Sequence, residues 1–334
     1  MPLPPAALAH WRQGYAVWQP LLTRASERLP MAALDLLLLC GGAGVLWRLW
    51  THRRRVRLLP VALSALALLS VTWLSFLALW GWHYQMPTLE VRLGLQASAA
   101  DGERGRAFAK ATVVTLNAGH AAAHAAAWPA PADLPGLLAP ALARVLPRLD
   151  VAWAPAWPRP RRTLLDWYFR AAGIDGMTNP FGLEILINSR VLDMERPALA
   201  AHEYAHLAGF ADEADASVVA WLACQGSGPA AQYSGALAVL PHLLTGLPRE
   251  TQHEVVRTLG EGPRADLRAI AARLAEQRPW VHAFAWQSYD RFLRANRVAD
   301  GVARYDAVAR ILIGAADPAT GTLRQWPRRR PASR

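Results

Sequence analysis

The chain has 334 residues, of which 53% are hydrophobic and 18% charged, and its formal net charge is +11. The apolar excess lies mostly in residues 31–82, which argues against a protein that is soluble over its whole length. Nearly all of the positive charge is arginine, scattered or beside apolar segments, so we expect no nucleic-acid partner.

Two apolar segments, residues 31–50 and 58–82, predict a transmembrane hairpin after a short lead of mixed polarity, residues 1–30. The second segment has no charged residue and, at about 1.5 Å per residue, is long enough for a hydrocarbon core of roughly 30 Å. The first segment contains Asp35, so a buried core helix is its alternative.

An arginine-rich stretch between the two segments predicts their orientation. It has no acidic residue and contains Arg48, Arg53, Arg54, Arg55 and Arg57. Positive charge beside membrane segments stays on the cytoplasmic side. We therefore expect the lipid bilayer as a partner, and residues 83–334 as an extracytoplasmic domain.

That domain is expected to be mainly α-helical with a small β element. Residues 183–188 alternate with the period of a strand, which places Glu184 and Asn188 on its polar face. Proline in the first turn and Gly209 after the last turn favour a helix between them, and Asp212 suits the start of another. Helices are expected at 99–128, 137–147, 163–172, 197–207, 212–224 and, for the most part, after 236.

The sequence HEYAH at 202–206 predicts a zinc-binding helix. Two histidines four residues apart project from one face of a helix, so His202 and His206 can ligate the same Zn²⁺. Zinc lowers the pKa of bound water to about 7, and Glu203, rotated by about 100° from His202, is placed to act as general base. The chemistry that this pattern favours is hydrolysis of a peptide bond.

A third zinc ligand is expected on the next helix. Glu213 and Asp215 are the candidates, and Asp215 is alternatively a helix-capping residue. Glutamate-type zinc peptidases place this ligand in a Glu-x-x-Ala-Asp-like context, which favours Glu213 and puts Ser217 where an outer acidic residue is usual.

Further candidates each have a structural alternative. Glu184 and Asn188 are candidates for substrate binding along an edge strand, or for a solvent-facing strand side. Tyr233 is a candidate hydrogen-bond donor to an oxyanion, or a packed tyrosine. His120 and His124 are also four residues apart, but no glutamate follows His120, and their alanine-rich setting indicates a surface helix.

Several stretches resemble the bacterial membrane family known as domain of unknown function 3810, a set of proposed zinc peptidases. They include FLALWGWHY at 76–84, NPFGLE at 179–184 with Asn188, the zinc helix, YSG at 233–235, YDRFLRAN at 289–296 and DGV at 300–302. The family usually has Ser-Tyr where this chain has Arg304 and Tyr305.

The resemblance implies a multi-pass protein of the bacterial inner membrane with a zincin-like metallopeptidase domain, acting on a peptide or protein substrate. The alternative function is that of a non-catalytic zinc-binding membrane protein, such as a sensor or an assembly factor. Neither the residues nor the resemblance identifies a substrate.

Overall fold

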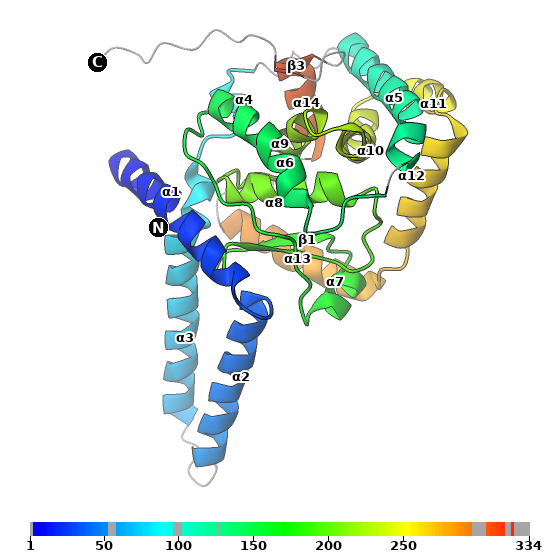
Figure 1. Ribbon diagram of the computed structural model, residues 1–334. Helices are drawn as coiled ribbons and strands as arrows, with labels where there is room; N and C mark the ends of the chain where they lie inside the picture. The colour runs from blue at the N-terminus through cyan, green and yellow to red at the C-terminus, as the bar shows by residue number, and fades with distance from the viewer. Residues whose placement is uncertain are drawn as a thin grey trace.

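The computed structural model describes residues 3–52, 58–95, 102–125, 127–295, 305–317 and 322–323. These residues are mainly helical, and their strands form two short antiparallel pairs (Figure 1). The predicted class, mainly α with a small β element, is therefore confirmed. The predicted helices at 99–128, 137–147, 163–172 and 197–207 are present, with their ends shifted by a few residues.

The N-terminal part consists of α1 (Pro5–Glu27), α2 (Ala33–His52) and α3 (Leu58–Leu79). Figure 1 shows α2 and α3 side by side as two rods that extend away from the other helices. In contrast, α1 lies against the later domain. Large apolar side chains on both rods are exposed, among them Leu46 and Leu69, each 68% exposed. Surfaces of this kind are suited to an apolar surrounding.

One membrane span is supported among the described residues. The segment Val61–Leu79 is long and apolar enough to cross a membrane and is mostly exposed. No other described helix meets the same criterion, so the second crossing of the predicted hairpin is not confirmed. The arginines at 53, 54, 55 and 57 lie outside the described residues.

Several of the remaining helices pack around α9 (Glu213–Gln225), most of whose side chains are buried. Its neighbours are α6 (Leu134–Val145), α8 (Arg196–Leu207), α10 (Pro229–Thr245) and α14 (Tyr305–Ala315), and α10 also packs against α5 (Gly102–Ala125). The other helical elements are η1 (Gly81–Gln85), α4 (Leu89–Arg92), η3 (Leu146–Leu149), α7 (Asp166–Ala172), α11 (Arg249–Arg257), α12 (Glu261–Leu274) and α13 (Pro279–Ala295).

A short hairpin of β1 (Gly176–Asn179) and β2 (Glu184–Ile187) lies beside α8, with Gly176 opposite Ile187. On its other edge β2 forms a bridge with Arg161, whose N–H donates to Ile185 O at 2.9 Å. Both edges of β2 are thus occupied. A second pair, β3 (Ala316–Asp317) and β4 (Thr322–Leu323), follows α14.

The N-terminal lead forms α1, which is packed into the domain. Tyr15 is 1% exposed, and its hydroxyl donates to Leu207 O at 2.9 Å. The Thr23 hydroxyl donates to Leu183 O at 2.7 Å. Buried side chains at 11, 15, 19, 23 and 26 repeat about every four residues, which is the helical spacing that joins α1 to the later chain.

Two buried carboxylates hold the start of α2. Glu184 accepts hydrogen bonds from the N–H groups of Ala33 and Leu34, each at 3.0 Å. Asp35 accepts the Thr163 hydroxyl at 2.6 Å. Negative charge is favourable at a helix N-terminus. This position also explains why an acidic residue is present in the first apolar segment: Asp35 lies at the junction with the domain and is 3% exposed.

Candidate metal centre

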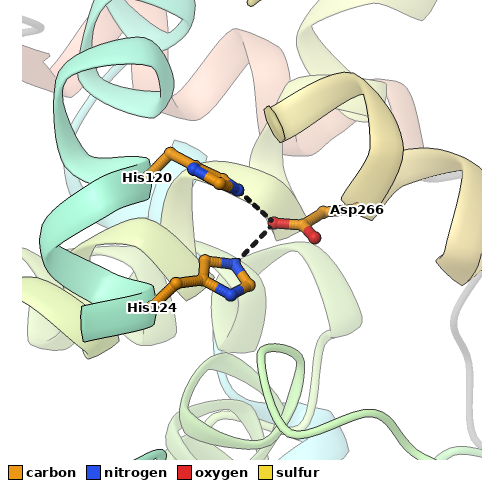
Figure 2. Close-up of side chains that lie close together, drawn as sticks. All are labelled: His120, His124 and Asp266. Carbon is orange, nitrogen blue, oxygen red and sulfur yellow. Dashed lines mark hydrogen bonds and ion pairs between the residues drawn. The ribbon is translucent and has the colours of Figure 1, made fainter. Parts of the chain in front are cut away.

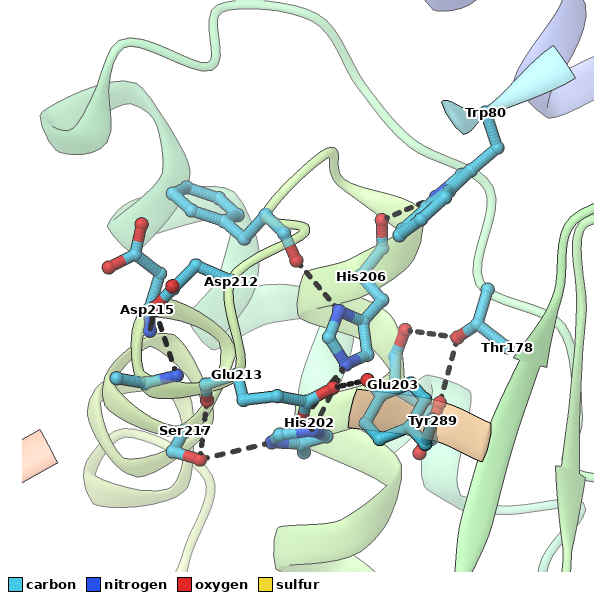
Figure 3. Close-up of polar contacts among 12 residues, drawn as sticks. Trp80, Thr178, His202, Glu203, His206, Asp212, Glu213, Asp215, Ser217 and Tyr289 are labelled. Atoms are coloured by element: carbon cyan, nitrogen blue, oxygen red, sulfur yellow. Dashed lines mark hydrogen bonds and ion pairs between the residues drawn. The ribbon is translucent and has the colours of Figure 1, made fainter. Parts of the chain in front are cut away.

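The predicted zinc helix is α8, and a tight turn after it brings the next helix back to the two histidines. Gly209 has φ of +100°, a left-handed conformation that glycine adopts without strain. Asp212 then caps α9 by accepting hydrogen bonds from two main-chain N–H groups of its first turn. Glu213, the first residue of α9, therefore lies opposite His202 and His206 (Figure 3).

Three potential ligand atoms converge in this cluster. Glu213 Oε2 lies 3.1 Å from His202 Nε2 and 3.7 Å from His206 Nε2, and the two Nε2 atoms are 3.1 Å apart. Zinc bonds of about 2.0–2.1 Å at tetrahedral angles separate neighbouring ligand atoms by roughly 3.3 Å. The separations in the cluster match this spacing.

The outer nitrogens of both rings are engaged in a way that suits metal binding. His206 Nδ1 is 2.7 Å from Phe210 O, which only accepts, so this nitrogen carries a proton. The Ser217 hydroxyl donates to Glu213 O at 2.8 Å and lies 3.3 Å from His202 Nδ1, from which it can accept. Both Nε2 lone pairs are then directed at Glu213. The two nitrogens and the carboxylate oxygen therefore repel one another unless a cation lies among them.

Without a cation, protons have to balance this charge. Burial lowers the pKa of His206, but the charge and hydrogen bonding of Glu213 outweigh burial and raise this pKa to about 9. Burial raises the pKa of Glu213, yet the two histidines bring it well below its ordinary value. A divalent cation would take the place of a proton in this group.

Glu203 lies beside the cluster, and a residue of β1 holds its carboxylate. Its Oε2 accepts the Thr178 hydroxyl at 2.8 Å, and the side chain is 4% exposed. Burial raises the pKa of Glu203, and the charges of His206 and His202 act in the opposite direction. A Cβ atom at Gly176 would lie 2.7 Å from Glu203 Oε1, so the absence of a side chain there leaves room for the carboxylate.

Tyr289 of α13 also reaches the cluster, since its hydroxyl donates to Glu213 Oε1. Sequence reasoning assigned no site role to Tyr289 or Thr178, although Tyr289 begins the YDRFLRAN stretch. That stretch is the signal that points to it. The contact with Glu213 spans 76 residues of the chain, so local spacing does not predict it.

Tyr233 and Asp215 lie elsewhere. The Tyr233 hydroxyl donates to Asp266 Oδ2 at 2.6 Å, and the Tyr233 side chain is 1% exposed. The structure therefore places Tyr233, the predicted oxyanion donor, in a different cluster from His202 and His206. Asp215 Oδ2 accepts the N–H of Leu89 at 2.9 Å, so Glu213, and not Asp215, lies with the histidines.

Glu184 and Asn188 do not line the centre. Successive side chains of a strand point to opposite faces. Thr178 reaches Glu203 from one face of the hairpin, while the pair Asn179 and Glu184 belongs to the other face, where Glu184 caps α2. Asn188 donates to Ile174 O at 2.9 Å and is 4% exposed. The expected exposed polar face is buried, and both predicted substrate-binding side chains have structural partners.

Comparison with known proteins identifies the family. The sequence matches the family described as "Protein of unknown function (DUF3810)" over residues 11–313. The chain belongs to the DUF3810 family. No curated protein and no solved structure matches it. Membership in DUF3810 confirms the resemblance seen in the motifs and assigns no activity, so the function has to be argued from the cluster itself.

Proposed function

We propose that this protein is a membrane-anchored zinc metallopeptidase. The observation that carries the proposal is the convergence of His202 Nε2, His206 Nε2 and Glu213 Oε2, with both Nδ1 atoms turned to acceptors. Two imidazoles and one carboxylate form a donor set used by catalytic zinc, which keeps a further position open. Zinc supplies Lewis acidity, which makes water nucleophilic near neutral pH and polarises a carbonyl group.

Glu203 is the proposed general base. Its carboxylate accepts a proton from the attacking water and passes it to the leaving amine, so one group serves both halves of the reaction. The Thr178 hydroxyl fixes Oε2, which leaves Oε1 for this transfer. The raised pKa of Glu203 makes it a stronger base than an exposed glutamate.

Tyr289 is the proposed donor to the carbonyl oxygen that gains negative charge. Its hydroxyl already lies at the cluster, on Glu213. A phenolic hydroxyl aimed at developing negative charge stabilises the transition state more than the ground state. The sequence analysis predicted this role for Tyr233, whose hydroxyl lies on Asp266.

Among the described residues β1 pairs with β2 alone, and its other edge is the proposed binding site for the substrate main chain. Ile185 O and Ile187 N bond to Arg161, so the even-numbered residues of β2 face β1. In this register the main-chain groups of Gly176 and Thr178 point away from β2. An extended peptide can add there as a further strand, beside the residue that holds Glu203.

A two-helix membrane hairpin is the proposed anchor. α1 packs on residues of the later domain, α2 begins at that domain, and α3 ends at it. This arrangement suits two membrane crossings that return the chain to the same side. The arginine-rich stretch between them favours a cytoplasmic loop, and hence a domain outside the cytoplasm of a bacterial inner membrane. Trp80, just after α3, donates to His206 O at 3.2 Å, which supports cleavage close to the membrane surface.

The experiment that tests the proposal measures zinc content and hydrolysis of a fluorogenic peptide library by the detergent-purified full chain. Glu203→Gln should retain zinc and lose about 100-fold or more in kcat/KM, since general-base catalysis contributes about 10²–10⁴-fold. His202→Ala should lose zinc from this site. His253→Ala, which removes an exposed histidine from α11, is the matched control.

Two results would contradict the proposal. Hydrolysis that survives in Glu203→Gln would remove the assigned base. A wild-type protein that binds zinc through His202 but cleaves no peptide would favour the alternative, a sensor or assembly factor. A reporter enzyme fused after residue 334, active only outside the cytoplasm, tests the orientation separately.

A further inference from the structure

A second group of side chains has the donor set of a metal site and takes no part in the proposed reaction. His120 and His124 lie on α5, and Asp266 lies on α12. Figure 2 shows both imidazole rings turned towards the Asp266 carboxylate. The potential ligand atoms of the three side chains all lie within 4.8 Å of one another. The group joins two helices that are far apart in the sequence.

The separations resemble those of the first cluster. His124 Nε2 lies 2.9 Å from Asp266 Oδ2, and His120 Nε2 lies 3.7 Å from the same oxygen. Ligand atoms around tetrahedral zinc are roughly 3.3 Å apart, so the two separations lie on either side of that spacing. The ring centroids of the two histidines are 4.4 Å apart, which keeps both on one side of α5.

The carboxylate is buried and held in place. Asp266 is 9% exposed, and its Oδ2 accepts the Tyr233 hydroxyl at 2.6 Å. Among the described residues its ion-pair partners are His120 and His124, and no lysine or arginine. A buried carboxylate is costly without a compensating positive charge. A hydroxyl that orients a ligating carboxylate is also a usual outer contact of metal sites.

Gly262 supplies an independent observation. A Cβ atom at this position would lie 2.5 Å from His120 Cε1 and 2.6 Å from His120 Nε2. Any side chain at 262 would require the His120 ring to move from its present position. The first turn of α12 thus leaves space for one histidine to lie against it, as Gly176 leaves space for Glu203 in the first cluster.

We propose that His120, His124 and Asp266 bind a second divalent cation of the zinc class, which fastens α12 to α5. Two imidazoles and one carboxylate favour zinc-class ions, whereas calcium and magnesium prefer oxygen ligands alone. Ala121 follows His120 where Glu203 follows His202, so this turn of α5 offers no neighbouring carboxylate to move a proton. The second cation is therefore structural.

The test measures zinc per chain after dialysis of the full-length protein, in detergent, against buffered zinc. The variant His202→Ala/His206→Ala removes the first site and is expected to retain one equivalent. Adding His120→Ala/His124→Ala to it should remove that equivalent, whereas adding His253→Ala should not. The outcome does not depend on peptidase activity, so a failure here is distinguishable from a failure of the proposed function.

A milder variant keeps the test valid if the multiple variant does not fold. Asp266→Asn, in the His202→Ala/His206→Ala background, preserves the shape of the side chain but removes a charged ligand. It is expected to abolish the visible absorption of bound Co²⁺ and the rise in thermal unfolding midpoint that zinc produces. A first-site variant that binds no zinc, or an equivalent that persists after loss of His120 and His124, would overturn the proposal.

Discussion

Two clusters with the same donor groups, two imidazoles and one carboxylate, occur among the described residues, and they differ in what surrounds them. Each has two histidines four residues apart and one carboxylate from another helix. The His202 cluster also has Glu203 beside its first histidine, whereas the His120 cluster has Ala121 there. In the first, a tyrosine reaches Glu213 from α13; in the second, Tyr233 reaches Asp266 from α10.

This difference shows that the ligands alone do not determine a role. Both clusters offer a place for a cation. Among the described residues, the first cluster also has Glu203 beside a histidine ligand and lies next to the proposed substrate-binding edge of β1. The second links helices whose contacting residues are 142 positions apart. We therefore assign chemistry to the first cluster and cross-linking to the second, and the following predictions test that division.

The two tyrosines should give the largest contrast. Tyr289→Phe removes the proposed donor to the carbonyl oxygen and is expected to lower kcat by about 100- to 1,000-fold, with little change in KM. Tyr233→Phe should leave kcat within about twofold, because its hydroxyl is engaged by Asp266. Steady-state kinetics on one fluorogenic peptide measure both variants.

The contrast depends on zinc remaining in the first cluster, so zinc content is measured in the same samples. Equal losses in Tyr289→Phe and Tyr233→Phe at full zinc content would remove the distinction between the clusters. A loss confined to Tyr233→Phe would restore the role that the sequence predicted for that residue.

Stability should fall with rising pH in the metal-free protein but not in the zinc-loaded protein. In the metal-free protein the pKa of His206 is about 9, above its ordinary value near 6.5, because Glu213 outweighs burial. This stabilisation is complete below about pH 6.5 and is lost as the pH rises towards 9. Zinc requires the neutral imidazole, so the zinc-loaded protein should not lose stability over this range.

Thermal unfolding of the detergent-purified protein between pH 6.5 and 9, with chelator or with zinc, measures this difference in pH dependence. Glu213→Gln removes the charge that raises the pKa of His206 and should flatten the metal-free curve. A metal-free protein whose unfolding midpoint stays constant across this range would contradict the electrostatic account of the first cluster.

The parts predicted correctly from sequence depend on residues that are close together in the chain. Periodicity and capping residues give α8 and α9, and a four-residue interval places His202 and His206 on one face. The turn at Gly209 and the start of α9 separate Glu213 from His206, so its position depends on few intervening residues. Local spacing leaves the choice between Glu213 and Asp215 open, because both lie in the same turn.

The parts that sequence reasoning missed depend on distant pairing. Glu184 was expected on an exposed strand face, but α2 begins against it, and a contact over 151 residues decides its role. His120 and His124 were expected on a surface helix, and Asp266, from a different helix, converts them into a cluster. Periodicity records which face a side chain occupies and not which element will cover that face.

Two glycines allow each cluster to be disturbed without touching a ligand. Gly176→Ala places a methyl group against Glu203 and should lower kcat/KM by about tenfold, since small misplacements of a catalytic group are costly. Gly262→Ala should displace His120 and weaken zinc binding at the second cluster, while the helix itself tolerates alanine well. Kinetics and zinc titration are performed on both variants.

Each glycine variant is the control for the other. Gly176→Ala is expected to leave the second zinc equivalent in place, and Gly262→Ala to leave kcat/KM unchanged within about twofold. Crossed effects, with Gly262→Ala slowing hydrolysis, would show that the two clusters are coupled and not independent.

The outer contacts should give the smallest effect, and they test whether the two clusters are built alike. Ser217 lies 3.3 Å from His202 Nδ1, a long contact, whereas the Tyr233 hydroxyl lies 2.6 Å from Asp266 Oδ2. Loss of an outer partner typically costs about 10–100-fold in metal affinity. Ser217→Ala is therefore expected to lower the zinc affinity of the first site by about tenfold or less. Tyr233→Phe is expected to lower the zinc affinity of the second site by nearer to about 100-fold. Competition with a chelator of known zinc affinity measures both, and a larger loss in Ser217→Ala than in Tyr233→Phe would mean that contact length does not govern how firmly each ligand is held.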